Sequence, residues 1–285
     1  PAVPCKLQYR IDPEVFRSQV VSVKEHVAAG DIIQAVISQP FECTPAPDPW
    51  WLYRGQRYIN PSPYLFFLHL GDTVLVGSSP ETMVRLENKI ATLRPIAGTR
   101  HRGADAATDL ALEREMLASE KECAEHVMLV DLARNDVGRV SVFGSVRVDP
   151  YMIVERYSHV MHIVSAVAGR LAPGLDAWDA LIAGFPAGTV SGAPKVRAME
   201  ILTELEGQPR GPYAGAVGFF GPGAQMDTCI AIRMLQFEPD GKVTVQAGAG
   251  IVADSLPEME YQETLDKVAG LAAAAAILLW EGRCG

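Results

Sequence analysis

The fold is decided by the stretch from Tyr64 to Glu87, YLFFLHLGDTVLVGSSPETMVRLE. It holds three runs of aliphatic, aromatic and β-branched residues, and each run has the length of a strand. Gly71-Asp72 separates the first two runs and is a hairpin signal. Consecutive strands that are joined by tight turns pair antiparallel. The stretch therefore predicts an antiparallel sheet.

Outward from this stretch, helices and strands come in runs rather than in strict alternation. That order favours an α+β fold over a doubly wound parallel sheet. Residues 40–49 are rich in proline and are predicted to form a loop. The predicted helices are residues 13–29, 107–131, 175–183, 194–205 and 258–279, and the further predicted strands are residues 31–39, 213–220, 226–237 and 243–247.

The composition bounds the class of protein. The 285 residues are 48% hydrophobic and 21% charged, with a net charge of -9. A chain of this size can bury a sizeable core, in one large domain or in two packed lobes. An acidic chain is a poor partner for nucleic acid or for an anionic membrane, and the apolar run from Val268 to Trp280 is too short to span a bilayer. We expect neither a nucleic-acid nor a membrane partner.

The cysteines and the N-terminal residues indicate the cellular compartment in which the protein is expected to lie. The cysteines are scattered, odd in number and without metal-type spacing, so we expect free thiols in a cytoplasmic protein. No signal peptide is present, and a start at Pro1 rather than Met indicates a cut or processed boundary. The five cysteines are Cys5, Cys43, Cys123, Cys229 and Cys284.

One acidic signature occurs twice in the chain. Glu122 and Glu125 lie in one predicted helix, and Glu260 and Glu263 lie in another. Residues three apart share a face of a helix, so each helix presents a pair of carboxylates. Two such pairs facing a common cavity would hold a hard divalent cation such as Mg²⁺. The alternative is that both pairs lie on solvated helix faces.

A glycine-rich segment precedes the predicted helix 194–205. This segment, FPAGTVSGAPK at residues 185–195, has the composition of an anion-binding helix N-terminus. A nucleotide P-loop is excluded, because it requires Gly-Lys-Ser/Thr and Lys195 follows a proline. The alternative is a capped helix start, with Thr189 or Ser191 as the capping residue.

Three further side chains are candidates for chemistry. Arg233 lies among apolar residues of a predicted strand, and it is either paired in the core or grips a carboxylate with two hydrogen bonds. His162 is either a general acid or base or a structural histidine. Glu81 follows a predicted strand and is either a proton donor or a turn residue.

Two short segments could approach a ligand closely. Thr99 and Arg100, in the segment PIAGTR, are available to an oxyanion. The small residues of QAGAGIV, residues 246–252, allow a ligand to reach the backbone. Each segment on its own is typical of a tight turn.

Taken in order, ten segments resemble the chorismate-utilising enzyme family, most closely its anthranilate synthase component I group. They follow the family's order and approximate spacing over nearly the whole chain from Gly30 onward. The resemblance implies the family's fold, two intimately packed lobes of mostly antiparallel sheet with helices on the outside. The segments are GDIIQAVISQ, YINPSPYLFFL, SSPE, LRPIAGTR, AEHVMLVDLARNDVGRV, YSHVMH, GTVSGAPKVRAMEIL, GPYAGAVGFF, DTCIAIR and VQAGAGIVADSLPEMEYQETLDK.

The resemblance also implies a metal site. Mg²⁺ would be held by Glu125 and Glu263, with Glu122 and Glu260 nearby as direct or water-mediated ligands. The metal would bind the ring carboxylate of chorismate, and Lys267 would lie near that carboxylate.

The remaining site residues follow from the same resemblance. Tyr213 and Arg233, with the backbone amides around Gly248 and Gly250, would hold the enolpyruvyl carboxylate, and Thr189 would add an anion contact. Ammonia would add at C2 of chorismate while hydroxide leaves C4, and elimination of pyruvate would give anthranilate. The catalytic residues would be Glu81, which protonates the departing hydroxyl, His162 close to the ring, and Thr99 in the same pocket.

Two positions narrow the reaction within the family. Aminodeoxychorismate synthases typically carry a nucleophilic lysine where this chain has Ala97, and isochorismate synthases carry a basic lysine where it has Gln34. Both absences favour ammonia as the nucleophile and the first step of tryptophan biosynthesis. An aminodeoxychorismate or aminodeoxyisochorismate synthase is the alternative. No cysteine lies in the context of a glutamine-cleaving nucleophile, so a separate glutamine amidotransferase subunit would supply ammonia in a hetero-oligomer.

We expect residues 1–285 to form one chorismate-binding catalytic domain, without the N-terminal regulatory region of the family. A di-metal carboxylate oxidase would need Glu-x-x-His on each of two helices, and the second acidic signature has no histidine. A non-catalytic relative that binds chorismate is the remaining alternative. The presence of the acid, the metal ligands and the arginine argues against it.

Overall fold

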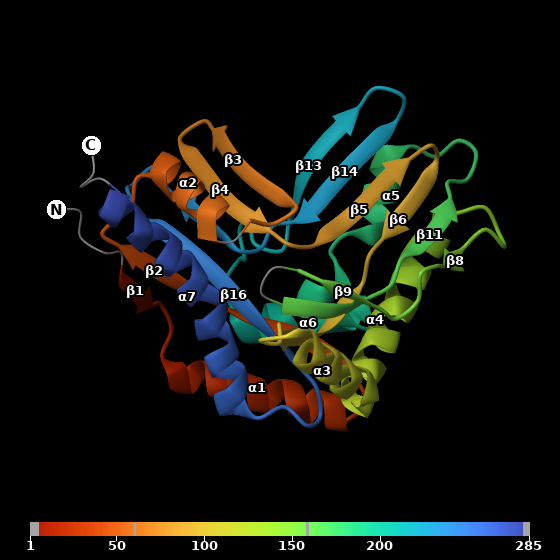
Figure 1. Cartoon of the computed structure of the whole chain (residues 1–285), viewed down its shortest axis with the longest axis horizontal. Coiled ribbons are helices and arrows are strands. Elements are labelled where there is room, and N and C mark those ends of the chain that lie inside the picture. The colour runs from red at the N-terminus through yellow and green to blue at the C-terminus, as the bar shows by residue number, and fades with distance from the viewer. Residues whose placement is uncertain (1–5, 60, 158–159, 282–285) are drawn as a thin grey trace. The chain divides into compact units, whose positions relative to one another are not determined.

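The computed structural model describes residues 6–59, 61–157 and 160–281, and these form two compact units. Unit 1 comprises residues 1–80, 190–216 and 230–285, and unit 2 comprises residues 81–189 and 217–229. Each unit combines sheet with helices, which confirms the α+β prediction (Figure 1). Each unit is also assembled from segments that are far apart in the sequence.

Unit 1 is built on a seven-stranded sheet. Its strands follow the order β1-β2-β16-β15-β4-β3, and β12 also pairs with β2. All of these pairings are antiparallel. The predicted hairpin at Gly71 joins β3 to β4. The strands are β1 (Lys6–Tyr9), β2 (Gln34–Thr44), β3 (Tyr64–Leu70), β4 (Thr73–Ser79), β12 (Gly192–Ala193), β15 (Met234–Phe237) and β16 (Val243–Ile251).

Helices pack against one face of this sheet. Ile37 of β2 and Ala249 of β16 form a buried cluster with Phe16 of α1 and Ile201 of α6. Successive residues of a strand point to opposite faces, so the residues between these core positions face away from the helices. Figure 1 shows α1 and α7 along the sheet. The helices of unit 1 are α1 (Pro13–Ala28), α2 (Pro49–Ile59), α6 (Lys195–Glu206) and α7 (Pro257–Glu281).

Unit 2 contains two sheets. Six strands follow the order β13-β14-β5-β6-β11-β8, and three more follow the order β7-β10-β9. Val137 of α4 packs on Val167 of β11, and Met116 of α3 packs on Met161 of β10. The elements are β5 (Thr82–Glu87), β6 (Ile90–Leu93), β7 (Ile96–His101), α3 (Ala106–Ala118), α4 (Glu120–Gly138), β8 (Arg147–Val148), β9 (Ile153–Arg156), β10 (Val160–Val164), β11 (Val167–Arg170), α5 (Ala177–Gly184), the 3-10 turn η1 (Gly188–Val190), β13 (Ala216–Gly221) and β14 (Gln225–Ile230).

Two predicted elements are each divided into two. The predicted helix 107–131 is wrong, because Ser119 ends α3 in an extended conformation and then caps α4 by accepting from the Glu122 amide. The predicted strand 226–237 is wrong, because residues 231–233 separate β14 from β15 and Arg233 among them has a φ of 53°. Strand β13 begins only at Ala216, so Tyr213 lies in the loop before it.

The predicted loop over residues 40–49 is also wrong in part. Strand β2 continues to Thr44, although it contains Pro40. The Pro40 carbonyl accepts from the Arg10 amide, and proline is tolerated because this side of β2 lies in a gap between its partners β12 and β1. Helix α6 begins at Lys195, within one residue of the predicted start, but the alternative in which Thr189 or Ser191 caps it is wrong, because Pro194 precedes the helix and no side chain caps it.

The cysteines differ from the prediction at one position. Cys123 and Cys229 are free thiols, as predicted, but Cys43 is disulfide-bonded. Spacing along a sequence does not show which cysteines meet in space, which is why the prediction failed at Cys43. Cys5 and Cys284 lie outside the described residues. Across the described helices, none is long and apolar enough to cross a membrane.

Candidate functional site

Unit 2 brings His162 and Thr99 together. Strands β10 and β7 pair with His162 opposite Thr99, and the Thr99 Oγ1 atom lies 3.0 Å from His162 Nδ1. The Gly98 carbonyl oxygen lies 3.1 Å from the same nitrogen. A carbonyl can only accept, so Nδ1 carries the proton and, in the neutral ring, Nε2 is the basic nitrogen. Strand β7 therefore fixes both the position and the tautomer of His162.

The first turn of α4 lies beside the same strand. The Arg100 guanidinium donates to Glu122 over 2.9 Å and to Glu115 over 3.2 Å. Arg100 was expected to be available to an oxyanion, and this expectation is wrong because both carboxylates already hold it. A Cβ atom at Gly98 would lie 3.1 Å from Glu122 Oε2, so the glycine lets the carboxylate approach β7. Glu125 follows one turn later on α4 and is half-buried.

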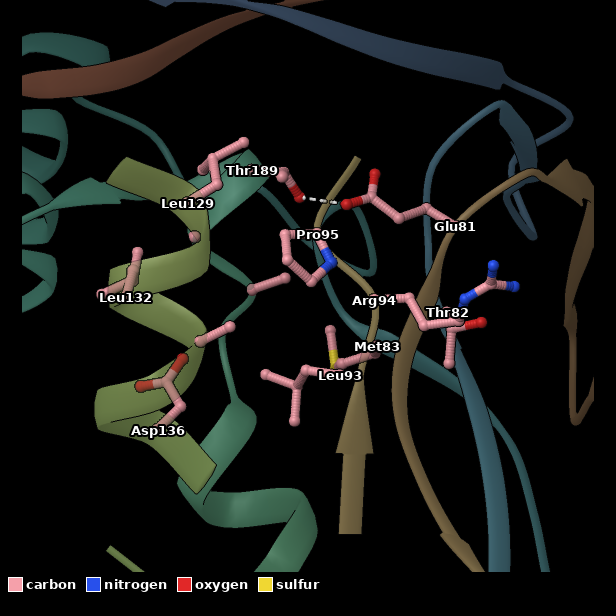
Figure 2. A pocket seen from close by; sticks show the side chains of 13 residues that line it. Glu81, Thr82, Met83, Leu93, Arg94, Pro95, Leu129, Leu132, Asp136 and Thr189 are labelled. Atoms are coloured by element: carbon pink, nitrogen blue, oxygen red, sulfur yellow. Dashed lines mark hydrogen bonds between the residues drawn. The ribbon is translucent and has the colours of Figure 1, made fainter. Parts of the chain in front are cut away.

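Glu81 and Thr189 meet at the mouth of a small cavity in unit 2. The Thr189 hydroxyl donates to Glu81 Oε1 over 2.8 Å, and Figure 2 shows the two side chains pointing toward one another. The centre of a water molecule can occupy about 30 Å³ of this cavity, so one or two water molecules fit inside it. Its walls are mostly apolar, with Met83, Leu93 and Leu129 among them.

Arg233 dominates the electrostatics of the candidate site in unit 1. Its guanidinium forms no hydrogen bond or ion pair with the part of the chain that the structure describes. Burial lowers the pKa of Arg233, and the nearby Tyr213 and Glu263 oppose that effect. The Arg233 carbonyl accepts from the Ser78 amide over 3.1 Å, which holds the residue at its positive φ. A half-buried guanidinium that makes no hydrogen bond with the described residues is available to an anionic ligand.

Tyr213 and Lys267 lie around the same glycine strand. Burial raises the pKa of Tyr213 to about 12, so its phenol is neutral and can donate a hydrogen bond. A Cβ atom at Gly248 would lie 2.9 Å from the Tyr213 hydroxyl, so only glycine fits there. The Lys267 ammonium donates to the Gly248 carbonyl over 2.8 Å and to Glu263 over 2.5 Å. Unit 1 thus gathers cationic and phenolic groups at one end of β16.

The predicted site residues are divided between the units. Within each unit the structure brings most of them into contact with one another, as the pairs above show. Their catalytic and binding roles stay predictions. Unit 2 carries Glu81, Thr99, Glu122, Glu125, His162 and Thr189, and unit 1 carries Tyr213, Arg233, Gly248, Gly250, Glu260, Glu263 and Lys267.

A sequence comparison assigns the chain to a family. The profile of the chorismate binding enzymes matches residues 1–273. The chain belongs to this family. The match covers both units, including every residue of the candidate site.

Relatives of this chorismate binding enzyme share its sequence closely. Anthranilate synthase component 1 of Synechocystis sp. is 53% identical over 276 residues, which are 94% of this chain and 54% of that protein. Anthranilate synthase alpha subunit 1, chloroplastic, of Oryza sativa subsp. indica is 50% identical, over 92% of this chain and 48% of that protein. The chain spans about half the length of the curated relatives that it matches.

Solved structures agree with this membership. Anthranilate synthase component I from Streptococcus pneumoniae superposes with a TM-score of 0.88 at 46% identity, over 95% of this chain and 60% of that one. The menaquinone-specific isochorismate synthase of Escherichia coli superposes with a TM-score of 0.86 at 24% identity, over 96% of this chain and 64% of that one. The second likeness shows a shared fold.

The four predicted metal ligands of this chorismate binding enzyme have the chemistry of a hard-cation site. Among the described residues, no group of three or more His, Cys, Asp or Glu side chains is arranged to hold a metal ion. Glu122 and Glu263 each accept from a basic side chain. The four predicted glutamates nevertheless offer only oxygen, which is the donor that Mg²⁺ prefers.

Sequence reasoning missed one buried ion pair in this enzyme. Arg210 donates to both oxygens of Glu206 over 2.6 and 2.7 Å, and to the carbonyls of Val36 and Val190 over 2.6 Å each. Glu206 also accepts from the amide and the hydroxyl of Ser38 over 2.8 Å. The pair fills the gap beside β2 between β12 and β1. Helix α6 ends at Glu206 with Gly207 as its C-cap, so Arg210 lies beyond the helix and helical spacing did not predict the contact.

Proposed function

We propose that this chain carries the activity of anthranilate synthase component I. It would convert chorismate and ammonia to anthranilate and pyruvate, the first step of tryptophan biosynthesis. The observation that carries the proposal is Arg233, a half-buried guanidinium without a hydrogen bond or ion pair among the described residues. Chorismate is a dianion, and a guanidinium binds a carboxylate with two parallel hydrogen bonds. The relatives named above support the choice of reaction.

Unit 1 would bind and orient the substrate. Arg233 and the Tyr213 phenol would donate to the enolpyruvyl carboxylate, together with the backbone amides of Gly248 and Gly250. Lys267 would stabilise the ring carboxylate. The absence of side chains at both glycines leaves room for the Tyr213 hydroxyl and the Gln34 amide beside β16.

Unit 2 would supply the proton chemistry. Glu81 would donate its proton to the C4 hydroxyl, so that the hydroxyl leaves as water. Thr189 donates to Glu81 Oε1 and would keep the proton on the other oxygen, Oε2. The Nε2 atom of His162 would accept a proton close to the ring, since Nδ1 already donates to Gly98. Thr99 would hold the imidazole in place.

The proposed site includes Mg²⁺. Glu125 and Glu263 would hold it, with Glu122 and Glu260 as direct or water-mediated ligands. When bound, the metal would neutralise the ring carboxylate of chorismate. Glu122 also forms an ion pair with the Arg100 guanidinium over 2.9 Å.

Ammonia would come from a partner. The relatives carry the name component 1, which points to a second component. We propose that this second component is a glutamine amidotransferase subunit, in a hetero-oligomer. Ammonium salt would then replace the partner in the test tube.

The test combines the purified chain with chorismate, Mg²⁺ and ammonium salt at mildly alkaline pH, and follows anthranilate fluorescence. The signal should vanish with EDTA and in Glu263→Gln, while Glu258→Gln on the same helix should keep it. Arg233→Ala should lower kcat/KM for chorismate at least about a hundredfold, since it removes a charge-assisted contact with a carboxylate of the substrate. The exposed and paired Arg197 provides the matched control, Arg197→Ala, which should leave kcat/KM unchanged.

Two results would contradict the proposal. Consumption of chorismate without fluorescence would show a synthase that stops at a non-aromatic aminated product. No consumption of chorismate by the native chain would remove the catalytic function altogether.

A further inference from the structure

Gln39 and Thr264 form a buried hydrogen bond between strand β2 and helix α7. Both residues are 0% exposed, and the Gln39 Nε2 atom lies 2.6 Å from Thr264 Oγ1. The Thr264 hydroxyl donates to the Tyr261 carbonyl over 2.7 Å, so it accepts from the Gln39 amide. The bond joins residues that are 225 positions apart in the sequence, and both belong to unit 1.

The surroundings of this hydrogen bond are apolar. Gln39 lies between the core residues Ile37 and Phe41 on the helix-facing side of β2. Thr264 lies one turn before Val268 on the buried face of α7. Apolar contacts are not directional, so on their own they would let α7 rotate or slide against the sheet. A hydrogen bond weakens steeply as its distance and angle change, so this one fixes the rotation of the helix.

The neighbouring face of α7 carries two residues of the candidate site. Glu263 and Lys267 flank the buried threonine in the sequence. The Lys267 ammonium donates to the Gly248 carbonyl over 2.8 Å, which requires α7 to lie close to β16. Gln39 is paired with Ala247 in the register of β2 and β16, so it attaches α7 beside the same segment of β16. A rotation of α7 would therefore move both site residues.

The amide of Gln39 is not the side chain that would stabilise this core best. Its Oε1 atom is buried and has no hydrogen-bond partner among the described residues. A buried amide oxygen without a partner is unfavourable. A leucine would fill a similar volume without that penalty. The polar pair is therefore better explained by the placement of α7 than by stability.

We propose that Gln39 and Thr264 are positioning residues for Glu263 and Lys267, an inference that rests on the proposed function. They touch neither chorismate nor the metal, because they lie on the helix-facing side of the sheet. Their hydrogen bond holds α7 at the rotation at which the Lys267 ammonium reaches the ring carboxylate and the Glu263 carboxylate reaches Mg²⁺. The two residues act on the reaction only through the position of this helix.

The test replaces the hydrogen bond by an apolar contact in the double variant Gln39→Leu, Thr264→Val. Because neither partner remains, the melting temperature should stay within about 3 °C of the native value. kcat/KM for chorismate should nevertheless fall at least about tenfold, since a displacement of about 1 Å in a site can cost a hundredfold in rate. A second readout needs no turnover. Mn²⁺ replaces Mg²⁺ in a binding measurement by electron paramagnetic resonance, and its Kd should rise at least about fivefold.

Two further variants separate position from stability. Thr264→Ser keeps the hydroxyl and loses a buried methyl group, so the melting temperature should fall while kcat/KM stays within about twofold of the native value. Gln262→Leu is the matched control, because Gln262 lies on the same helix and its amide donates to Asp266 on the exposed face. Neither kcat/KM nor the Kd for Mn²⁺ should change in this control.

The outcomes separate this inference from the proposed function. Native kcat/KM and native Mn²⁺ affinity in the double variant would overturn the inference and leave the function in place. A fall of kcat/KM that follows the melting temperature across all variants, Thr264→Ser included, would also overturn it, because it would show a role in stability alone.

The native chain itself decides the remaining cases. If it binds Mn²⁺ but makes no product, the proposed function is wrong. Weaker Mn²⁺ binding by the double variant then supports the inference, whereas unchanged binding overturns it. A native chain that neither binds Mn²⁺ nor makes product overturns both.

Discussion

The ion pair between Glu206 and Arg210 should be a main determinant of the stability of unit 1. The Arg210 and Glu206 side chains are only 18% and 6% exposed. In Arg210→Met the aliphatic stem is largely kept, but Glu206 loses its countercharge and the carbonyls of Val36 and Val190 lose a donor. Removing one partner of a buried ion pair typically costs about 3–5 kcal/mol. We expect a loss of that size in the free energy of unfolding.

The assay is urea unfolding followed by tryptophan fluorescence in a Trp178→Phe background. Trp178 belongs to unit 2, whereas Trp50, Trp51 and Trp280 belong to unit 1, so the remaining signal reports on unit 1. A second variant separates charge from packing. Glu206→Gln combined with Arg210→Met keeps an acceptor for Ser38 and removes the unpaired charge, so it should recover about 1–2 kcal/mol.

Two results would refute this reasoning. If Arg210→Met lowers the free energy of unfolding by less than about 1 kcal/mol, the pair stabilises the protein no more than an exposed ion pair does. A double variant less stable than the single one would show that the buried charge of Glu206 is not the cause of the loss.

Three further predictions concern other residues. Arg233→Gly should abolish chorismate turnover but raise the melting temperature, because it relieves a positive φ in a non-glycine residue, worth about 1 kcal/mol. Gly192→Ala should cost at least about 2 kcal/mol in chemical denaturation, since the new Cβ would lie 2.3 Å from the Gln34 carbonyl oxygen, whereas Gly174→Ala, with open space around it, should cost less. Hydrogen bonds from Arg102 and the Gly103 amide lower the pKa of Asp109 below 3.8. Its contribution to stability is therefore present above pH 3.8 and is lost as the pH falls through the lower folded value, so the difference in stability between Asp109→Asn and the native chain should disappear in strong acid. A difference that does not depend on pH would contradict the assigned cause.

The sequence predicted where helices and strands occur better than it predicted the residues at which they break. The hairpin at Gly71 and the long helix after Pro257 were readable because turn residues and apolar spacing are local signals. The breaks at Ser119 and Arg233 were not readable. Ser119 lies within a run of good helix formers, and Arg233 adopts a backbone conformation that only tertiary contacts can impose.

The candidate site was predictable to a similar degree. Ordered family motifs supplied its residues. The contact between Thr99 and His162 depends on the pairing of β7 with β10, which the sequence analysis did not predict. Other contacts depend on which side chains meet across the fold. The pairing of Arg100 with two glutamates and the hydrogen bond between Gln39 and Thr264 belong to this class, so spacing along the chain did not indicate them.

The gap beside β2 has a consequence for self-association. An open strand edge offers unpaired amides and carbonyls to another chain and invites intermolecular sheet formation. Along residues 36–40 side chains occupy that side of β2. Arg210 donates to the Val36 carbonyl, and Glu206 accepts from the Ser38 amide. Pro40 has no N–H group that could donate to another strand. A foreign strand would have to expel a buried ion pair before it could add there. Variants that lose Arg210 should therefore not only unfold more easily but also aggregate through this edge while unit 1 is still folded.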